Sequence, residues 1–246
     1  MGSLWLAQIA WLGQADNQLR AARRLVVVRL RHQREVLRLR NTQHFFDETL
    51  KQLGRLANQS SVAMDLASLR GFEGKGAQLY FAGLQRLLPK WVEFEGRERR
   101  PPLDPFNALL SLGYTVLFGY VEAVIRANGL LPWVGMYHQP HGSHAVLVSD
   151  LIEPFRHLVE RAALNVLNKR ELEATDFFMS DNLGCRLQDA ARRRYLAALT
   201  TQFETPFRGN PTGKSEKLPV HLQWQVQHLC LWIRGQVAKL KIWQMS

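Results

Sequence analysis

Four ionisable side chains lie where the surrounding sequence gives no ordinary reason for a charge. Glu73 is bracketed by glycines inside a helical pattern, and His138 lies in a segment rich in proline and glycine. Asp150 and Glu153 follow in the run VLVSDLIEPFR, and at this spacing on a helix they share one face and can direct oxygen atoms at one cation. Two carboxylates this close repel unless a metal ion or a proton separates them. One imidazole with two or three carboxylates suits manganese or magnesium better than thiolate-seeking metals.

Each of these residues also has an ordinary structural explanation. A single helical glutamate is usually solvated, and a loop histidine is more often not a ligand. His141 and His144 are close to His138 in the sequence, and zinc would compete if all three rings pointed inward, but no fixed zinc spacing is present. Cys185 and Cys230 have no CxxC partner, which predicts reduced thiols in a cytoplasmic protein. The residue pattern alone leaves a metal site and separate structural roles both open.

The charge of the chain predicts a polyanionic partner. Among 246 residues, 32 Lys and Arg stand against 21 Asp and Glu, a net charge of +11, and nucleic acid is the first candidate. Arginines concentrate over residues 20–40, where Glu35 is the single acidic residue, and a second basic stretch lies in the predicted loop 95–105. The longest apolar stretch, Leu109 to Ile125, is interrupted by glycines and a glutamate, so no membrane partner is expected.

Helices are predicted along most of the chain and would position these residues. Apolar spacing of three to four residues predicts helices over residues 4–56, 60–88, 106–128, 146–167, 169–175, 183–203 and 220–243. Helix 106–128 is apolar nearly all round and should lie at the centre, whereas Pro154 should kink its helix or lie in the first turn. Segment 206–219 reads as a mobile basic loop. No alternating β pattern is found, so the predicted fold class is all-α, a multi-helix bundle.

These elements divide into three parts of one continuous helical domain. Residues 1–58 form basic N-terminal helices, residues 59–205 a metal-binding catalytic core, and residues 206–246 the basic loop and the last helix. The first part is expected to pack on the core.

Four sequence blocks, in this order, resemble the CRISPR-associated endonuclease/integrase family, Cas1: GFEGKGAQLYF, GRERRPPLDPFNALLSLGY, NGLLPWVGMYH and SDLIEPFR. They cover roughly residues 66–180. The resemblance implies a bundle like that family's C-terminal catalytic domain. In the family, a glutamate in the first block, a histidine ending the third and two acidic residues in the fourth form the metal site. This implies Glu73, His138, Asp150 and Glu153 as catalytic residues and ligands of Mn²⁺ or Mg²⁺.

The function implied by this resemblance is metal-dependent transesterification that inserts short DNA duplexes at a CRISPR repeat array. The expected partners are a prespacer duplex, the repeat DNA, a small ferredoxin-like adaptation subunit and, in the full-length form, a second copy of the chain. Arginines near the blocks and in the basic helix are expected to bind DNA phosphates. The predicted DNA-binding residues are Arg31, Arg34, Arg38, Arg97, Arg99, Arg100 and Arg156.

One feature departs from the family pattern. Its members normally begin with a small β-rich domain that forms the homodimer interface, whereas this sequence opens in the helical region. The alternatives are therefore an inactive or truncated DNA-binding and assembly module, or the C-terminal part of a reverse transcriptase fusion. The same site acting with water would give a nuclease. A helical ribonuclease using Arg38 and His44 is a further alternative.

Overall fold

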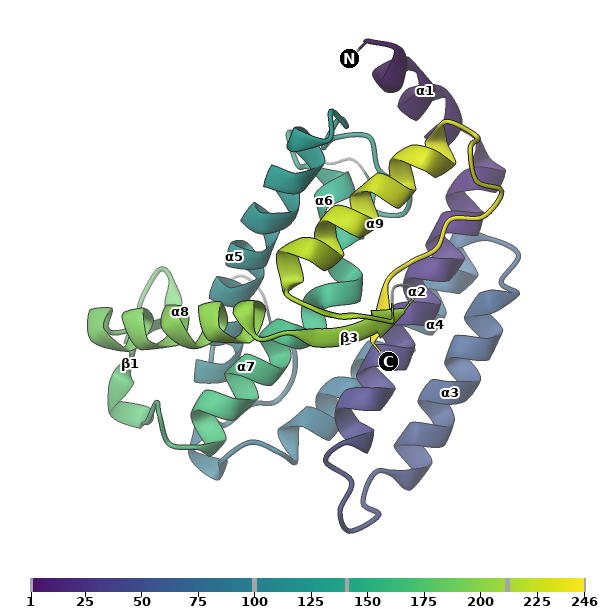
Figure 1. Cartoon of the computed structure of the whole chain (residues 1–246). Helices are drawn as coiled ribbons and strands as arrows, with labels where there is room; N and C mark the ends of the chain where they lie inside the picture. Colours follow the sequence, from purple (N-terminus) through teal and green to yellow (C-terminus); the bar gives the residue numbers. More distant parts are fainter. Residues whose placement is uncertain (1, 99–100, 140–141, 211–212, 246) are drawn as a thin grey trace.

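The computed structural model describes residues 2–98, 101–139, 142–210 and 213–245, and helices make up most of it (Figure 1). The α-helices are α1 (Gly2–Leu12), α2 (Ala15–Arg38), α3 (Asp47–Ser61), α4 (Leu66–Gln85), α5 (Pro105–Ala127), α6 (Val146–Ile152), α7 (Arg156–Asn168), α8 (Asp189–Glu204) and α9 (Leu218–Ile233). Short 3₁₀ turns are η1 (Lys90–Val92), η2 (Glu153–Phe155) and η3 (Ala174–Asp176). The strands are β1 (Phe177–Ser180), β2 (Gly184–Leu187), β3 (Phe207–Asn210), β4 (Ser215–Glu216) and β5 (Gln244–Met245).

The prediction of an all-α fold is wrong, because the chain contains two small antiparallel sheets. β1 pairs with β2, and β3 lies between β4 and β5. Each strand is only two to four residues long, which is too short for a visible alternation of apolar and polar residues. The predicted loop over 206–219 therefore contains β3 and β4, whose pairing depends on distant contacts.

Several predicted helix boundaries also need correction. The stretch 4–56 is divided among α1, α2 and most of α3, while the 169–175 segment holds only the start of η3. The last helix ends at Ile233 rather than near residue 243. Gly235 follows it with φ +68° and donates to the Trp232 carbonyl at 3.1 Å, a left-handed C-terminal cap that favours glycine. The interruption expected at Pro154 is present as η2 between α6 and α7.

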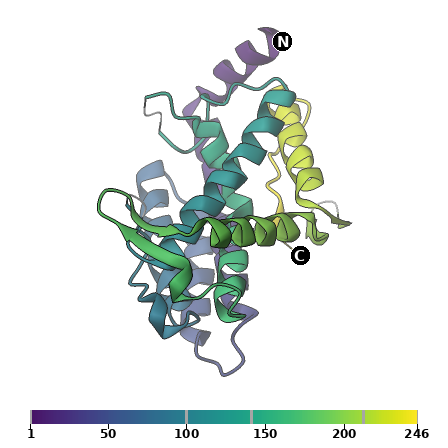
Figure 2. The same cartoon turned by 90° about the vertical axis from the view of Figure 1, so that its left-hand side faces the viewer.

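Helix α5 lies among α6, α7, α8 and α9, and α8 crosses it (Figure 2). The Asp104 side chain caps its start by accepting from the Asn107 N–H at 2.8 Å. Gly113 permits close packing with α7, because a Cβ there would lie 2.4 Å from a Val159 methyl carbon. By length and composition alone α5 could span a membrane. In this structure one side of the helix is buried in the bundle, and the Glu122–Arg126 ion pair lies on its exposed side.

Helix α2 is held between α3 and α4 and the C-terminal segment, which crosses it to form β5 (Figure 1). The Met245 N–H donates to His32 Nε2 at 2.8 Å. The fully buried Trp243 stacks on His157 with the two rings 3° from parallel. The hydrophobic core joins buried residues from all three predicted parts of the chain. The domain boundaries within it stay a prediction.

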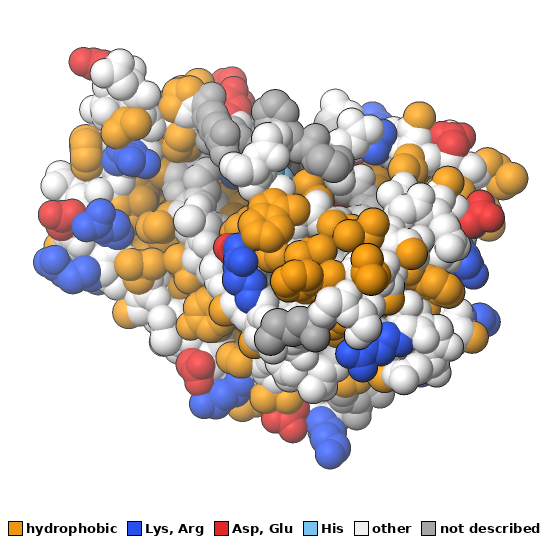
Figure 3. Space-filling view, turned by 90° about the horizontal axis from the view of Figure 1, so that it is seen from above, with side chains coloured by type: hydrophobic (Ala, Val, Ile, Leu, Met, Phe, Trp, Pro, Cys, Tyr) orange, Lys and Arg blue, Asp and Glu red, His pale blue; other side chains and the backbone are white. Residues whose placement is uncertain are grey.

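The face that carries α1 shows an area of apolar side chains (Figure 3). Among the large apolar side chains that are exposed, α1 contributes Trp5, Leu6 and Ile9. The Trp5 indole N–H donates to the Gly129 carbonyl at 2.9 Å, just beyond the end of α5. Helix α1 is therefore attached to the bundle by this bond as well as by its buried Leu4.

Candidate active site

Asp150 on α6 builds the loop that ends at His138. Its carboxylate is fully buried and accepts the backbone N–H groups of Met136 at 2.5 Å, Tyr137 at 3.1 Å and His138 at 2.9 Å. Gly135 lets the loop approach this closely, because a Cβ there would lie 2.7 Å from Asp150 Oδ2. Three backbone donors satisfy a buried carboxylate well. Asp150 therefore points its oxygen atoms at the loop, which the sequence did not predict.

Asp150 also orients the His138 ring. His138 Nδ1 lies 2.7 Å from Asp150 Oδ1, which assigns the proton to Nδ1 and leaves the Nε2 lone pair free to accept. Nε2 lies 4.0 Å from Glu153 Oε1. Burial lowers the pKa of His138, but the bond to Asp150 and the negative charges of Asp150, Glu153 and Glu73 outweigh it and raise that pKa. A carboxylate on one imidazole nitrogen is the usual support for a histidine that binds metal through the other.

A buried arginine links the two glutamates. Arg29 on α2 places one guanidinium nitrogen 2.5 Å from Glu153 Oε2 and its Nε 3.7 Å from Glu73 Oε1. The side chains of Arg29 and Glu153 are 8% and 6% exposed, and that of Glu73 is 23% exposed. Burial alone would lower the pKa of Arg29. The negative charges of Glu153, Glu160 and Glu73 outweigh burial, so the pKa is raised above its usual value. The guanidinium is therefore a fixed positive charge between α4 and η2.

Glu73 has a second partner in the His138 loop. The Tyr137 hydroxyl donates to Glu73 Oε2 at 2.7 Å. Burial and the charge of Glu73 raise the pKa of Tyr137, so the phenol stays protonated. The structure thus brings Glu73, His138 and Glu153 into one site, with Asp150 behind the histidine.

The donor atoms of this site are of the types that suit a hard divalent cation. Their arrangement in this structure does not surround a position for one. Two carboxylates and an imidazole nitrogen are suitable ligands for manganese or magnesium. Among the described residues, no group of three or more His, Cys, Asp or Glu side chains is arranged to hold an ion. In this arrangement Arg29 supplies one positive charge between Glu73 and Glu153.

A second polar layer supports Glu153 from the interior. Arg156 lies 3.4 Å from Glu153 Oε1, and its guanidinium carbon is 3.8 Å from the centre of the Tyr114 ring. Glu160 accepts the hydroxyl groups of Tyr80 and Tyr114, each at 2.7 Å. Arg156 is only 7% exposed. Its position suits support of Glu153 better than the predicted contact with a DNA phosphate.

The family model for CRISPR associated protein Cas1 matches residues 1–201. The chain belongs to the Cas1 family. It is 34% identical over 242 residues to a Cas4/Cas1 fusion protein of Rhodospirillum rubrum, covering 95% of this chain and 42% of that protein. It is 31% identical over 210 residues to a Cas1 endonuclease of Chlorobaculum tepidum, covering 81% of this chain and 57% of that protein. The chain therefore spans about half of each of these Cas1 relatives.

A solved structure described as a Cas6-RT-Cas1–Cas2 complex contains a region with the same fold. The superposition has a TM-score of 0.89 at 35% sequence identity and covers 98% of this chain and 27% of that one. Membership of the family confirms the resemblance of the four blocks.

Of the three predicted DNA-binding arginines in the 95–105 loop, the structure describes Arg97. Arg97 is half-buried and donates to Asn107 Oδ1 at 2.8 Å and Ser111 Oγ at 3.2 Å. These contacts hold the loop on α5. Arg99 and Arg100 lie outside the described residues.

The predicted DNA-binding arginines on α2 are exposed. Arg34 donates to the Leu50 carbonyl at 3.1 Å, and Arg38 forms an ion pair with Glu35 at 2.6 Å. Arg31 donates weakly to Gln244 at 3.4 Å. Exposed guanidinium groups with such partners can still exchange them for phosphate oxygens. Phosphate binding by these residues stays a prediction.

The residues of the zinc and ribonuclease alternatives do not assemble into a site. His144 Nε2 shares a hydrogen bond with Ser149 Oγ at 2.7 Å and is not part of the group around His138. His141 lies outside the described residues. His44 pairs with Asp47 at 3.2 Å and its side chain is 83% exposed. A ribonuclease histidine would need an arginine directed at the same phosphate, and in this structure Arg38 pairs with Glu35 whereas His44 pairs with Asp47.

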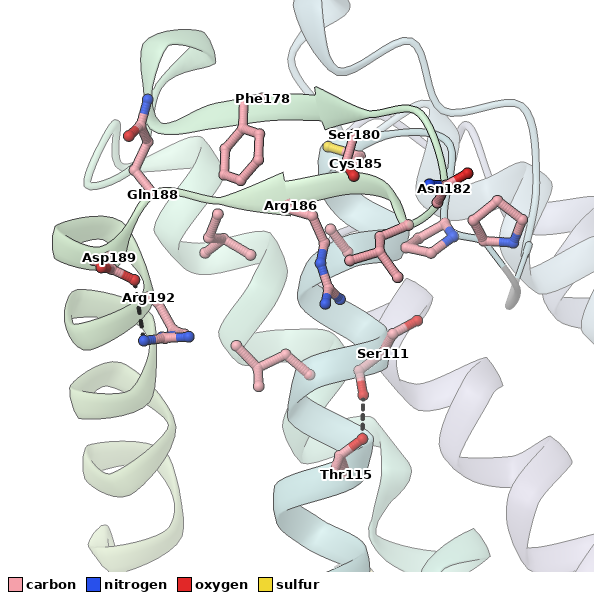
Figure 4. Close-up of a pocket in the computed structure, with 16 residues that line it drawn as sticks. Ser111, Thr115, Phe178, Ser180, Asn182, Cys185, Arg186, Gln188, Asp189 and Arg192 are labelled. Carbon is pink, nitrogen blue, oxygen red and sulfur yellow. Dashed lines mark hydrogen bonds and ion pairs between the residues drawn. The ribbon is translucent and has the colours of Figure 1, made fainter.

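A cavity of about 1140 Å³ lies away from these residues, between the β1–β2 hairpin, α5 and α8 (Figure 4). Its charged groups are Arg186, Arg192 and Asp189, and the last two pair at 3.0 Å. A smaller cavity of about 530 Å³ includes His138 and Tyr137. The chemistry favours the smaller one, because its lining residues His138 and Tyr137 contact Asp150 and Glu73, whereas no histidine is among the residues that line the larger cavity.

The sequence reasoning missed Arg29, Tyr137 and Glu160. Arg29 is one of the arginines that concentrate over residues 20–40. Its helical position gives the signal, because it lies four residues after Leu25 and seven after Ala22, both buried. A charged residue on the apolar stripe of a helix needs an internal partner.

Proposed function

We propose that this chain is the catalytic part of a CRISPR adaptation integrase, a metal-dependent DNA integrase and endonuclease. The observation that carries the proposal is the joint placement of Glu73, His138 and Glu153 in a chain of the Cas1 family. The Chlorobaculum tepidum relative is named an endonuclease, which supports phosphodiester chemistry.

The proposed reaction is a transesterification. The 3′-oxygen of a short duplex forms a new bond to a phosphorus atom at the edge of a repeat, and the bond from that phosphorus to the 3′-oxygen of the target strand breaks. The proton of the attacking hydroxyl leaves and the departing oxygen gains one. One phosphodiester bond replaces another, so the reaction needs no nucleotide cofactor. Water in place of the 3′-hydroxyl would give endonuclease activity at the same site.

Glu73, His138 and Glu153 are the proposed ligands of Mn²⁺ or Mg²⁺. A bound divalent ion acidifies the attacking hydroxyl and neutralises charge on the phosphate. Asp150 was predicted as a fourth ligand, but its bonds to the 136–138 loop support a positioning role for the His138 ring. Arg29 and Arg156 hold Glu153 in place.

The proposed partners are DNA, both as prespacer duplex and as repeat, a small adaptation subunit and a second copy of the chain in the full-length form. The exposed arginines of α2 support DNA binding that weakens steeply with salt. The solved complex to which the chain is similar contains Cas2, which supports a partner subunit. The proposed location is the cytoplasm.

Strand transfer tests this function directly. A labelled duplex and a supercoiled plasmid with one repeat are incubated in manganese with the parent protein, His138→Ala and His44→Ala. We expect joined products from the parent and from His44→Ala, because His44 is an exposed histidine outside the site. His138→Ala should give no joined or cut product. Undiminished activity of His138→Ala would reject the assigned site.

The same assay separates the alternative functions. Cut plasmid without joined product identifies a nuclease. Neither product, together with DNA binding in a mobility-shift measurement, identifies a binding and assembly module. Loss of activity in His44→Ala would contradict the assigned site, because His44 lies outside it.

A further inference from the structure

Gln8 is a polar residue on the buried side of α1. The buried residues of this helix are Leu4, Gln8 and Leu12, which recur every four residues and form the stripe that faces the bundle. Gln8 is fully buried. An amide in such a position costs free energy unless its hydrogen-bonding groups find partners inside the protein. The partners of Gln8 therefore indicate its role.

The Gln8 amide bonds to the backbone of the loop that ends at His138. Its Nε2 donates to the carbonyls of Leu131 and Val134, each at 2.9 Å, and its Oε1 accepts the Leu131 N–H at 2.8 Å. Both kinds of group in the amide, the donor nitrogen and the acceptor oxygen, are thus used. One side chain of α1 fixes two residues that lie 123 and 126 positions later in the chain.

Helix α1 is itself attached at several points, so these bonds have a rigid anchor. Asn17, which is fully buried near the start of α2, donates to the Trp11 carbonyl at 3.0 Å and fixes the junction of the two helices. Trp11 packs edge-on against Trp232 of α9, with the ring centroids 5.7 Å apart. The bond from Trp5 to the Gly129 carbonyl attaches the first part of α1 to the end of α5.

Two side chains from different helices hold the two halves of this loop. Gln8 of α1 holds residues 131 and 134, and Asp150 of α6 accepts the N–H groups of residues 136–138. Gly135 alone separates the Val134 carbonyl, which is bonded to Gln8, from the Met136 N–H, which is bonded to Asp150. A shift of Val134 must therefore reach Met136, because one intervening residue has little length to absorb it.

We propose that Gln8 is a positioning residue for the candidate metal site, which fixes the start of the loop so that Asp150 can hold its end and aim the His138 ring. The inference rests on the proposed function for the identity of His138 as a ligand. The geometry that Gln8 preserves is the 4.0 Å approach of His138 Nε2 to Glu153 Oε1. A displacement of about 1 Å in a catalytic constellation can lower the rate about 100-fold, even when the altered residue is remote.

Amide hydrogen exchange followed by NMR tests this role without metal. Gln8→Met keeps the length of the side chain and removes its donors and its acceptor. We expect the N–H groups of residues 136–138 to exchange about tenfold faster, the factor for loss of one ordinary hydrogen bond. This acceleration is measured relative to the amides of α3, which packs on α2 and α4 and reports the overall stability in the same sample.

Two other variants make the test specific. Trp5→Phe is the matched control on the same helix, because it removes the indole donor to the Gly129 carbonyl and leaves the bonds of Gln8 in place. Exchange of residues 136–138 should then stay within about threefold of the parent. Gln8→Glu keeps the acceptor for the Leu131 N–H and loses at least one donor, so Leu131 should stay protected while residues 136–138 exchange faster.

Manganese affinity, measured by titration calorimetry, gives a second readout. Gln8→Met should bind manganese about 10-fold more weakly, the lower end of the range for residues that orient metal ligands, and Trp5→Phe should bind it as the parent does. Melting curves verify that the variants are folded.

Faster exchange of Leu131 alone, with residues 136–138 unchanged, would make Gln8 a local structural residue and overturn the proposal. Equal acceleration in Trp5→Phe, or of the α3 amides, would overturn it as well, as would a manganese affinity of Gln8→Met equal to that of a parent that binds the ion. A parent that binds no manganese contradicts the proposed function instead. The exchange measurement uses no metal and still decides whether Gln8 positions the loop.

Discussion

Removal of Arg29 should be among the most destabilising single changes in this chain. Arg29→Met leaves a side chain of similar length, so the main effect is loss of the positive charge. Glu153, 6% exposed and bonded to Arg29 at 2.5 Å, would lose its closest counter-charge. Glu73 would lose a weaker partner at 3.7 Å and is 23% exposed, so solvent screens part of that loss.

The magnitude follows from this burial. Removal of one member of a buried ion pair costs about 3–5 kcal/mol. Arg156 stays 3.4 Å from Glu153 Oε1, so the lower end of this range is expected. In a chain of this size each 1 kcal/mol lowers the melting temperature by roughly 2–4 °C, so a fall of about 10 °C is expected. Urea unfolding followed by circular dichroism gives the free energy of unfolding. Arg24→Met is the matched control, since Arg24 is exposed on the opposite side of α2, and it should change stability by about 0.5 kcal/mol or less.

Metal provides a second readout. A divalent ion bound by Glu73 and Glu153 can replace the positive charge that Arg29→Met lacks, so manganese should raise the melting temperature of this variant more than that of the parent. A loss of less than about 1 kcal/mol, or a loss equal to that of Arg24→Met, would refute the assignment of Arg29 as the internal counter-ion. Equal manganese shifts in variant and parent would refute the link to the metal site.

Two further predictions concern the histidines. Asp150→Asn removes the charge that orients His138, so manganese affinity measured by titration calorimetry should fall about 10-fold to 100-fold; unchanged affinity contradicts this role. Burial lowers the pKa of His32 from 6.5 to about 4, so its neutral form stabilises the fold above about pH 6.5 and this contribution is lost as the pH falls toward 4. The difference corresponds to about 3 kcal/mol, and urea midpoints across this range should fall less in His32→Gln.

The helices could be predicted from the sequence because each buries a long periodic stripe. Helix α5 is an example: its buried side chains recur along 23 residues, and a proline and a capping aspartate mark its start. The strands could not be predicted in this way. β3 is four residues long and pairs with β5, which is more than thirty residues later in the chain, so tertiary contacts specify it. The end of α9 at Ile233 left a signal in Gly235, whose left-handed conformation stops the helix.

The residues of the site could be identified from their types and order, but their division of labour could not. Asp150 and Glu153 are equivalent in the sequence, two acidic residues one helical turn apart. In the structure Pro154 opens the turn between α6 and α7, and Asp150 faces the loop while Glu153 faces Arg29. Such a difference depends on which backbone N–H groups lie nearby, and these come from residues twelve or more positions away.

Helix α2 links the candidate site to the C-terminal segment of the chain. Arg29 contacts Glu73 and Glu153 on one side of the helix, while Arg24 is exposed on the other. The Met245 N–H donates to His32, whose ring packs at a tilt against His157, one turn beyond Glu153. The same helix therefore joins the ion pairs of the candidate site to β5.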